Sequence, residues 1–202
     1  MSKLISMSLY GDIPMYIDGA YENIRLLKDY YPDYTIRIYC SEPLDIECET
    51  IVMGPSFEHS GMFWRFIPIW ENHTHVLFRD TDSRFNPRET AAVRAWEESD
   101  HVAHSMHDHE HHRCYPLFGG MWGIKHDHTG DRIPKIDIPY SVHQPRVADM
   151  DWLRGSIWPH IENDTLHHSS VALKWKSLPF PEHTECEGFV GQQHDDKGLV
   201  FR

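Results

Sequence analysis

The sequence predicts an α/β fold, with one domain built on a central sheet and flanking helices. Short apolar runs of strand length alternate with longer segments of helical spacing, in the order strand, helix, strand, strand. The 202 residues can enclose one hydrophobic core, and no repeat or linker divides them. In such folds a nucleotide binds at the carboxyl ends of the strands.

The first quarter of the chain is predicted to hold three strands and one helix. Residues 4–10 form an apolar run that Gly11 closes, as expected for a buried strand and a turn. Residues 21–31 carry apolar side chains at helical spacing, and residues 34–40 alternate as a strand does. Residues 51–53 are predicted to form the third strand.

The central part continues the alternation of helices and strands. Residues 62–70 are predicted to be helical, and residues 74–79 to form a central strand that leads into an acidic turn. Asn86 and Pro87 have the properties of an N-cap and a first-turn proline, so a helix should run to about residue 98.

The second half carries weaker signals. Residues 101–106 are a further predicted strand, and the glycines of residues 119–123 indicate a close, irregular backbone. Residues 149–164 return to helical spacing, with Pro159 as a possible kink. Residues 174–189 are interrupted by prolines and are predicted to wrap over the site.

Composition excludes several classes of protein. The formal net charge of −12 argues against a nucleic-acid binder, which needs a basic surface for phosphate contacts. The 17 histidines should make that charge less negative as pH falls through about 6. There is no signal peptide or membrane span in the sequence, so a soluble cytoplasmic protein is expected.

The four cysteines give no metal or redox motif. Cys40, Cys48, Cys114 and Cys186 form no CxxC pair. A disulfide between Cys40 and Cys48 is one interpretation, and scattered reduced thiols are the favoured one.

The strongest local signal is a DxD segment (residues 80–82) at the end of the predicted central strand. A turn there can bring Asp80 and Asp82 around one cation that prefers oxygen ligands and leaves positions open for phosphate. Arg84 and Arg65 could add positive charge to a departing diphosphate. The alternative is a plain turn in which Asp82 or Ser83 caps the next helix.

Several motifs in succession resemble a family of small viral and bacterial GT-A type glycosyltransferases, which includes a chlorella-virus glycosyltransferase domain. The resemblance covers nearly the whole chain. It is carried by SLYG at 8–11, by Gly19, Asn23 and the LLK at 26–28, by YP at 31–32, GMFWRF at 61–66, RDTDSR at 79–84, Asp108, His109 and His112, and GGMWG at 119–123.

The resemblance implies a single GT-A domain with a mixed central sheet flanked by helices. Residues 1–84 would form its nucleotide-binding half and residues 85–202 its sugar- and acceptor-binding half. Asp80 and Asp82 would hold Mn²⁺, with Mg²⁺ as the second choice, against a nucleotide-sugar donor for which UDP is the first guess. The other substrate would be a glycan acceptor.

The resemblance also assigns further site residues. The donor site would comprise Leu9, Tyr10, Gly11, Arg65, Thr81, Arg84, Gly119, Gly120 and Trp122, with Tyr10 stacking on the base. Asp108 would line the sugar pocket. A base would come from Asp149 first or Asp151 second, although Met150 stands where related enzymes have Gln. His194 is a candidate metal ligand, and a solvent-exposed polar tail is the alternative.

The run of histidines between residues 101 and 112 suggests zinc. His107, His109 and His111 would share one face if the strand continued through them. Because no HExxH or cysteine pair supports such a site, the favoured interpretation is that one or two line the sugar pocket and the rest are solvated.

Among the seven tryptophans, Trp64, Trp96 and Trp175 are predicted to be core residues. Trp122 lies between glycines, where it could present a face to a sugar ring or pack in the core.

The leading hypothesis is a metal-dependent glycosyltransferase. A nucleotidyltransferase would also use paired carboxylates, but it should have a glycine-rich basic loop after the first strand, and residues 10–14 lack one. A sugar- or metal-binding module without turnover is the non-enzyme alternative. Release of free nucleotide diphosphate would separate it from a transferase.

Overall fold

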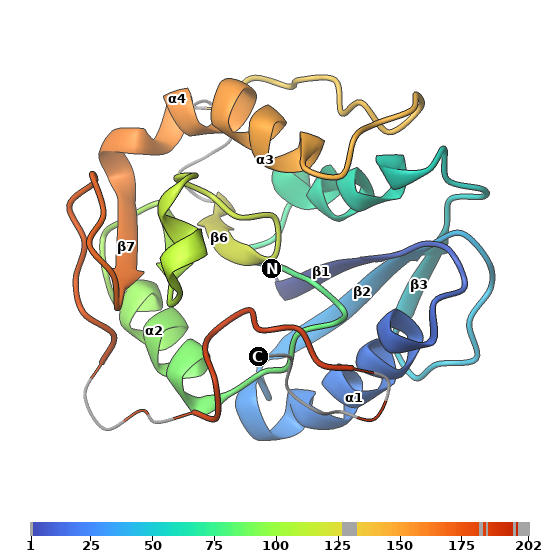
Figure 1. Cartoon of the computed structure of the whole chain (residues 1–202), viewed down its shortest axis with the longest axis horizontal. Coiled ribbons are helices and arrows are strands. Elements are labelled where there is room, and N and C mark those ends of the chain that lie inside the picture. The colour runs from blue at the N-terminus through green and yellow to red at the C-terminus, as the bar shows by residue number, and fades with distance from the viewer. Residues whose placement is uncertain (1, 127–132, 182–183, 185, 196, 198–202) are drawn as a thin grey trace.

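A computed structural model describes residues 2–126, 133–181, 184, 186–195 and 197. Its centre is a seven-stranded sheet in the order β3-β2-β1-β4-β6-β5-β7 (Figure 1). Only β6 runs antiparallel to its neighbours. The strands are β1 Lys3–Leu9, β2 Tyr34–Cys40, β3 Glu49–Val52, β4 His75–Arg79, β5 Ala103–His107, β6 Met121–Lys125 and β7 Thr165–Ser169.

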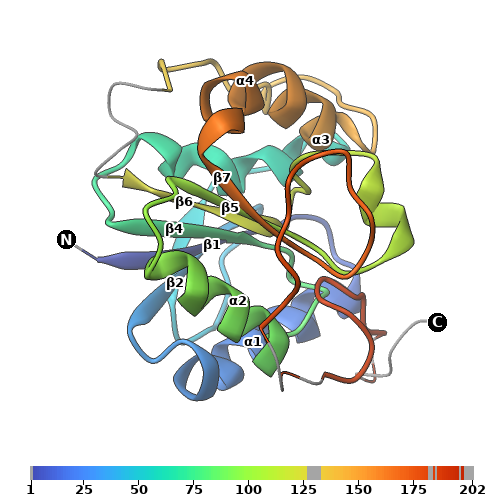
Figure 2. The same cartoon turned by 90° about the vertical axis from the view of Figure 1, so that its left-hand side faces the viewer.

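Helices cover both faces of the sheet, as Figure 2 shows. One face carries α1 (Pro14–Tyr30) and α2 (Pro87–Glu97). The other carries the 3₁₀ helix η1 (His59–Trp70) and a run of short helices between β6 and β7. That run comprises α3 (Ala148–Trp152), the π-helical turn η4 (Leu153–Ile157), α4 (Trp158–Ile161) and the 3₁₀ turn η5 (Glu162–Asp164). The predicted fold class, an α/β domain with a mixed sheet between helices, is confirmed.

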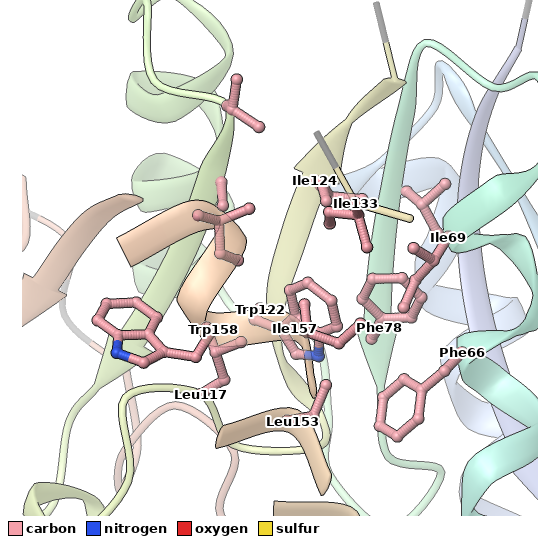
Figure 3. Packing of buried hydrophobic residues seen from close by; sticks show 14 of the residues in the cluster. Phe66, Ile69, Phe78, Leu117, Trp122, Ile124, Ile133, Leu153, Ile157 and Trp158 are labelled. Atoms are coloured by element: carbon pink, nitrogen blue, oxygen red, sulfur yellow. The ribbon is translucent and has the colours of Figure 1, made fainter. Parts of the chain in front are cut away.

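Alternation along the strands divides the core into two layers. In β1, Leu4 packs on the η1 face, while Ile5 and Met7 pack on the α1 face. On the η1 face, Phe78 of β4 and Trp122 of β6 stack with ring centroids 4.2 Å apart (Figure 3).

The position of Trp122 corrects one prediction. Its side chain is fully buried, so it cannot offer a face to a sugar ring. The backbone is irregular only up to the glycine pair, and strand β6 begins at Met121. The alternative prediction, that Trp122 packs in the core, is confirmed.

Helix starts were predicted where the signal is local. At α2, the Asn86 side chain accepts a hydrogen bond from the backbone N–H of Glu89 at 2.9 Å, and Pro87 is the first helical residue. Helix α1 begins at Pro14, earlier than the predicted residue 21, because a proline fits the first turn of a helix even though Ile13 provides no side-chain cap.

The second half departs more from prediction. Strand β5 ends at His107 and the chain turns into the 3₁₀ helix η2 (Glu110–Arg113), so His107, His109 and His111 do not share a strand face. Residues 149–164 form short helical pieces rather than one helix, and α4 starts with Pro159 in its first turn. Strand β7 was not predicted.

Two further predictions concern membrane-spanning helices and the cysteines. Among the described residues, no helix combines the length and apolar character needed to cross a bilayer. All four cysteines are free thiols.

Candidate functional site

The candidate site lies where the order of the strands reverses. Strand β1 pairs with β2 on one side and with β4 on the other, and the chain proceeds outward in both directions. Open α/β sheets bind ligands in the crevice outside the carboxyl ends of such strands. Tyr10 follows β1 directly and Asp80 follows β4 directly, so both lie at this point.

Helix α1 holds the DxD segment in place. The Asn23 side-chain amide donates to the carbonyl of Ser83 at 2.9 Å, and its oxygen accepts from the backbone N–H of Phe85 at 3.3 Å. Gly19 lies so close to the carbonyl of Thr81 that a Cβ there would overlap it. Two residues that carried the family resemblance therefore have a structural role in shaping this turn.

Strand β1 holds the backbone of Arg65 in place. The hydroxyl of Ser6 donates to the carbonyl of Arg65 at 2.7 Å, and the hydroxyl of Ser8 accepts from its N–H at 2.9 Å. Small polar side chains let η1 approach the sheet closely and satisfy its backbone. The Arg65 side chain is directed into the site and is 6% exposed.

Arg65 brings two of the predicted carboxylates together. Its guanidinium donates to Asp80, and to the Asp149 carboxylate at 2.6 Å. The backbone of Gly119 and Gly120 closes over the same groups, because a Cβ on Gly119 would overlap Arg65 and Asp149 and one on Gly120 would overlap Asp80. Side chains from η1, the end of β4 and α3 thus converge under the backbone of the turn before β6.

Negative charge exceeds positive charge among these side chains. Asp80, Asp82 and Asp149 supply three carboxylates against the one guanidinium of Arg65. Burial, and then the nearby charge of Asp80, raises the pKa of Asp82. Burial likewise raises the pKa of Asp149, although Arg65 opposes this. A divalent cation would offset the negative charge of these carboxylates.

The donor set fits a cation of the Mn²⁺ or Mg²⁺ type only in part. Carboxylate oxygens suit both ions, and the Asp80 side chain is 43% exposed. Within the described part of the chain, no group of three His, Cys, Asp or Glu side chains is arranged to hold a metal by itself. Further ligands would have to come from phosphate oxygens or water, which is how such ions bind at nucleotide sites.

Gly120→Ala tests this geometry. The new methyl group would overlap the Asp80 carboxylate, so we expect the variant to lose nucleotide binding and, through overpacking, ~1–3 kcal/mol of stability. Calorimetric titration with nucleotide and a urea denaturation curve would measure both. Gly155→Ala is the matched control, since a Cβ there meets no atom within 4 Å. Unchanged binding in Gly120→Ala would contradict the close approach.

Asp151, the second choice for the base, and Asp108, predicted to line the sugar pocket, lie elsewhere. The Asp151 side chain is half-exposed and is bound by Arg154 at 2.9 Å and by the Tyr115 hydroxyl at 3.1 Å. Asp108 is buried, and its carboxylate accepts from Arg88 at 2.9 Å and from the backbone N–H of Val190 at 3.0 Å. Asp149, the first choice for the base, is the one that lies with Asp80.

The remaining donor-site predictions occupy varied positions. Tyr10 packs edge-on against Trp64, and burial raises its pKa to about 12. Leu9 is buried in the α1-side core, and Gly11 is exposed with φ 75°. The Arg84 guanidinium donates to the carbonyls of Thr81 and Ser83, so it braces the turn.

Three neighbours of the DxD segment were not predicted. Burial raises the pKa of the Tyr16 hydroxyl. The negative charges of Asp82 and Asp80 raise this pKa further, and the positive charge of Arg146 lowers it. The amide of Gln193 donates to Asp82. Tyr16 stands in the first turn of α1 and the others are on loops, so no local pattern marks them. The backbone N–H of the predicted ligand His194 donates to the carbonyl of Asp82 at 2.8 Å.

The histidines between residues 101 and 112 are not arranged as a zinc site. His104 and His107 are buried in β5 and bond to His168 and His167 of β7. His109 stacks on Phe189 with centroids 4.5 Å apart. These contacts use the imidazoles for packing and hydrogen bonding.

Comparison with known proteins finds similarity to solved structures. No protein-family model matches the sequence. No curated protein matches it either. A solved structure of a glycosyltransferase involved in the glycosylation of the major capsid of PBCV-1 is similar to this chain. The TM-score is 0.48 with 16% identity, over 84% of this chain and 82% of that one. A likeness of this degree does not carry function from one protein to another.

Proposed function

We propose that the protein is a glycosyltransferase that binds a nucleotide-diphosphate sugar at the carboxyl ends of β1 and β4. The observation that carries this proposal is the convergence of Asp80, Asp82, Arg65 and Asp149 under the Gly119–Gly120 backbone at the switch point of the sheet. The family resemblance of the same residues agrees with it.

Asp80 and Asp82 would hold the divalent cation, with Mn²⁺ favoured and Mg²⁺ as the second choice. When bound, the ion neutralises the donor diphosphate and stabilises it as a leaving group. Arg65 is fixed by η1 and β1 without needing the ligand, so its charge is already oriented toward the same region. UDP is the favoured nucleotide, and Tyr10 at the end of β1 is the residue proposed to stack on the base.

Asp149 is the proposed general base that takes the proton from the acceptor hydroxyl. It is 6% exposed, and burial raises its pKa, which makes the carboxylate a stronger proton acceptor. Its ion pair with Arg65 at 2.6 Å links it to Asp80, so donor and acceptor groups share one anchor. A glycan hydroxyl is the proposed acceptor.

Calorimetric titration of UDP, GDP and dTDP, with and without Mn²⁺, tests the proposal. We expect one nucleotide to bind only with metal, and the binding to disappear in Asp80→Asn/Asp82→Asn. The matched control is Asp151→Asn, which changes a half-exposed carboxylate paired with Arg154. It should bind nucleotide as the wild type does.

Other outcomes separate the alternatives. Binding of no nucleotide by folded protein would contradict the proposal. Metal-dependent binding without release of free diphosphate from any donor would favour a module without turnover. Activity of Asp149→Asn at the wild-type rate would remove Asp149 as the base while leaving the donor site intact.

A further inference from the structure

Residues 188–194, here called the C-terminal strap, cross the outside of the candidate site. Figure 2 shows this segment at the carboxyl ends of the strands. The N–H of Val190 donates to the Asp108 carboxylate at 3.0 Å. The N–H of His194 donates to the carbonyl of Asp82 at 2.8 Å. The strap therefore joins the end of β5 to the DxD segment.

The strap is anchored rather than loose, which excludes the alternative of a solvated polar tail. Val190 is 1% exposed and packs in a small core cluster with Met106, Met121, Ala92 and Phe180. Gly191 has φ 81°, and a Cβ there would overlap the sulfur of Met121. Arg88 holds Asp108 at 2.9 Å and thereby fixes the carboxylate to which the strap is bound.

The strap places one side chain on the candidate metal ligand. The Gln193 amide nitrogen donates to Oδ2 of Asp82, 111 residues away in the chain. An ionised carboxylate can only accept, so the NH₂ group must face it. A carboxylate has about four lone-pair sites, so this bond leaves others for a cation. Gln193 itself is exposed to solvent.

We propose that Gln193 is a positioning residue that fixes the orientation of the Asp82 carboxylate toward the cation and the diphosphate. The proposal rests on the function proposed above. Carboxylates that bind metals are oriented by hydrogen bonds from an outer layer of residues, and loss of one such partner typically weakens metal affinity ~10–100-fold. The backbone bond from His194 fixes the main chain of Asp82, and Gln193 fixes its side chain.

Gln193→Met tests this role, because methionine keeps the length of the side chain and removes the donor. Mn²⁺ would be titrated into the 202-residue chain with UDP present, and the free Mn²⁺ would be followed by electron paramagnetic resonance. We expect an affinity ~10–100-fold below wild type with an unchanged urea midpoint. Gln144→Met is the matched control, since that amide donates to the carbonyl of Pro139 instead. Gln193→Ala should repeat the result.

Two different failures can be told apart. In the first, wild-type protein binds Mn²⁺, Asp82→Asn does not, and both Gln193 variants bind Mn²⁺ as wild type does. The proposed role of Gln193 is then wrong and the proposed function stands. If wild-type protein binds neither Mn²⁺ nor UDP, the metal site itself is wrong and the role of Gln193 falls with it.

Discussion

Acidification from pH 7.5 to pH 5.5 is expected to remove on the order of 5 kcal/mol from the free energy of unfolding. The cause is a cluster of five buried histidines, and its members come from β5, η2 and β7. They are His104, His107, His112, His167 and His168, none more than 8% exposed.

Burial holds these rings in the neutral form, and their hydrogen bonds are those of neutral imidazoles. His107 Nδ1 lies 2.8 Å from the carbonyl oxygen of His112, so that nitrogen carries the hydrogen. The Ser105 hydroxyl donates to the carbonyl of Pro116 at 2.9 Å. His107 Nε2 is therefore an acceptor in the neutral ring, and it lies 3.1 Å from the Ser105 hydroxyl and 3.1 Å from His167 Nδ1. A second proton on His107 would place a charge inside this buried cluster.

The other pair has the same property. His104 Nε2 and His168 Nδ1 lie 2.8 Å apart, and only one hydrogen fits between them. In the described part of the chain, His104 Nδ1 and His167 Nε2 have no hydrogen-bond partner, so a proton added there would be buried without an acceptor. The facing groups are aromatic rings: Trp96 stacks on His104, Trp175 on His167, and Phe180 lies against His168.

The sign of the effect follows from the pKa values. Burial lowers the pKa of His107 and His168 to about 4, and that of His112 and His167 to about 3. The unfolded chain takes up these protons near pH 6.5, so stability is complete above that pH and is lost as pH falls toward 4. Asp82 and Asp149 oppose the loss, because their pKa values are raised, but they are fewer.

Urea denaturation at pH 7.5, 6.5 and 5.5 measures the effect. His167→Phe should reduce the pH slope by about 1.4 kcal/mol per pH unit, since one titrating group is removed from a position that already stacks on Trp175. His160→Phe changes an exposed histidine and serves as the control. A wild-type unfolding free energy that stays constant across this range would contradict the prediction.

The histidine cluster also shows where sequence-based prediction stops. Strands with continuous apolar runs and the α2 start at Asn86 were predicted because their signals are local. Strand β7 has the sequence TLHHS, which no apolar pattern marks. Its burial comes from β5 on one edge and from a backbone pairing with Leu178 on the other, and these contacts join distant parts of the chain.

The candidate site divides in the same way. Asp80, Asp82 and the glycine pair stand next to a strand end, so spacing and residue type could indicate them. Trp122 was ambiguous because its neighbours are glycines, yet the register of β6 against β4 turns it onto Phe78. Gln193 reaches Asp82 only because the strap folds back across the sheet, and no sequence window contains both residues.

Glu89→Ala is expected to lower the free energy of unfolding by ~3–5 kcal/mol, because it leaves a buried arginine without its partner. Arg79 and Glu89 are 2% and 3% exposed and lie 2.6 Å apart. The Tyr31 hydroxyl donates to the same carboxylate oxygen at 3.0 Å. Urea denaturation measures the loss, and Glu22→Ala is the control, since its pair with Arg25 is exposed and should contribute less than about 1 kcal/mol.

The same pair fixes the site, because Arg79 directly precedes Asp80 and Glu89 lies in the first turn of α2. Both ends of the loop that carries the DxD segment are therefore tied together. Arg79→Met/Glu89→Leu removes both charges and should be more stable than Glu89→Ala. If the pair positions Asp80, this double variant will fold, but its binding of nucleotide and Mn²⁺ will remain weaker than that of the wild type. Wild-type binding by the double variant would mean that Arg65 and Asn23 hold the DxD segment without help from the buried ion pair.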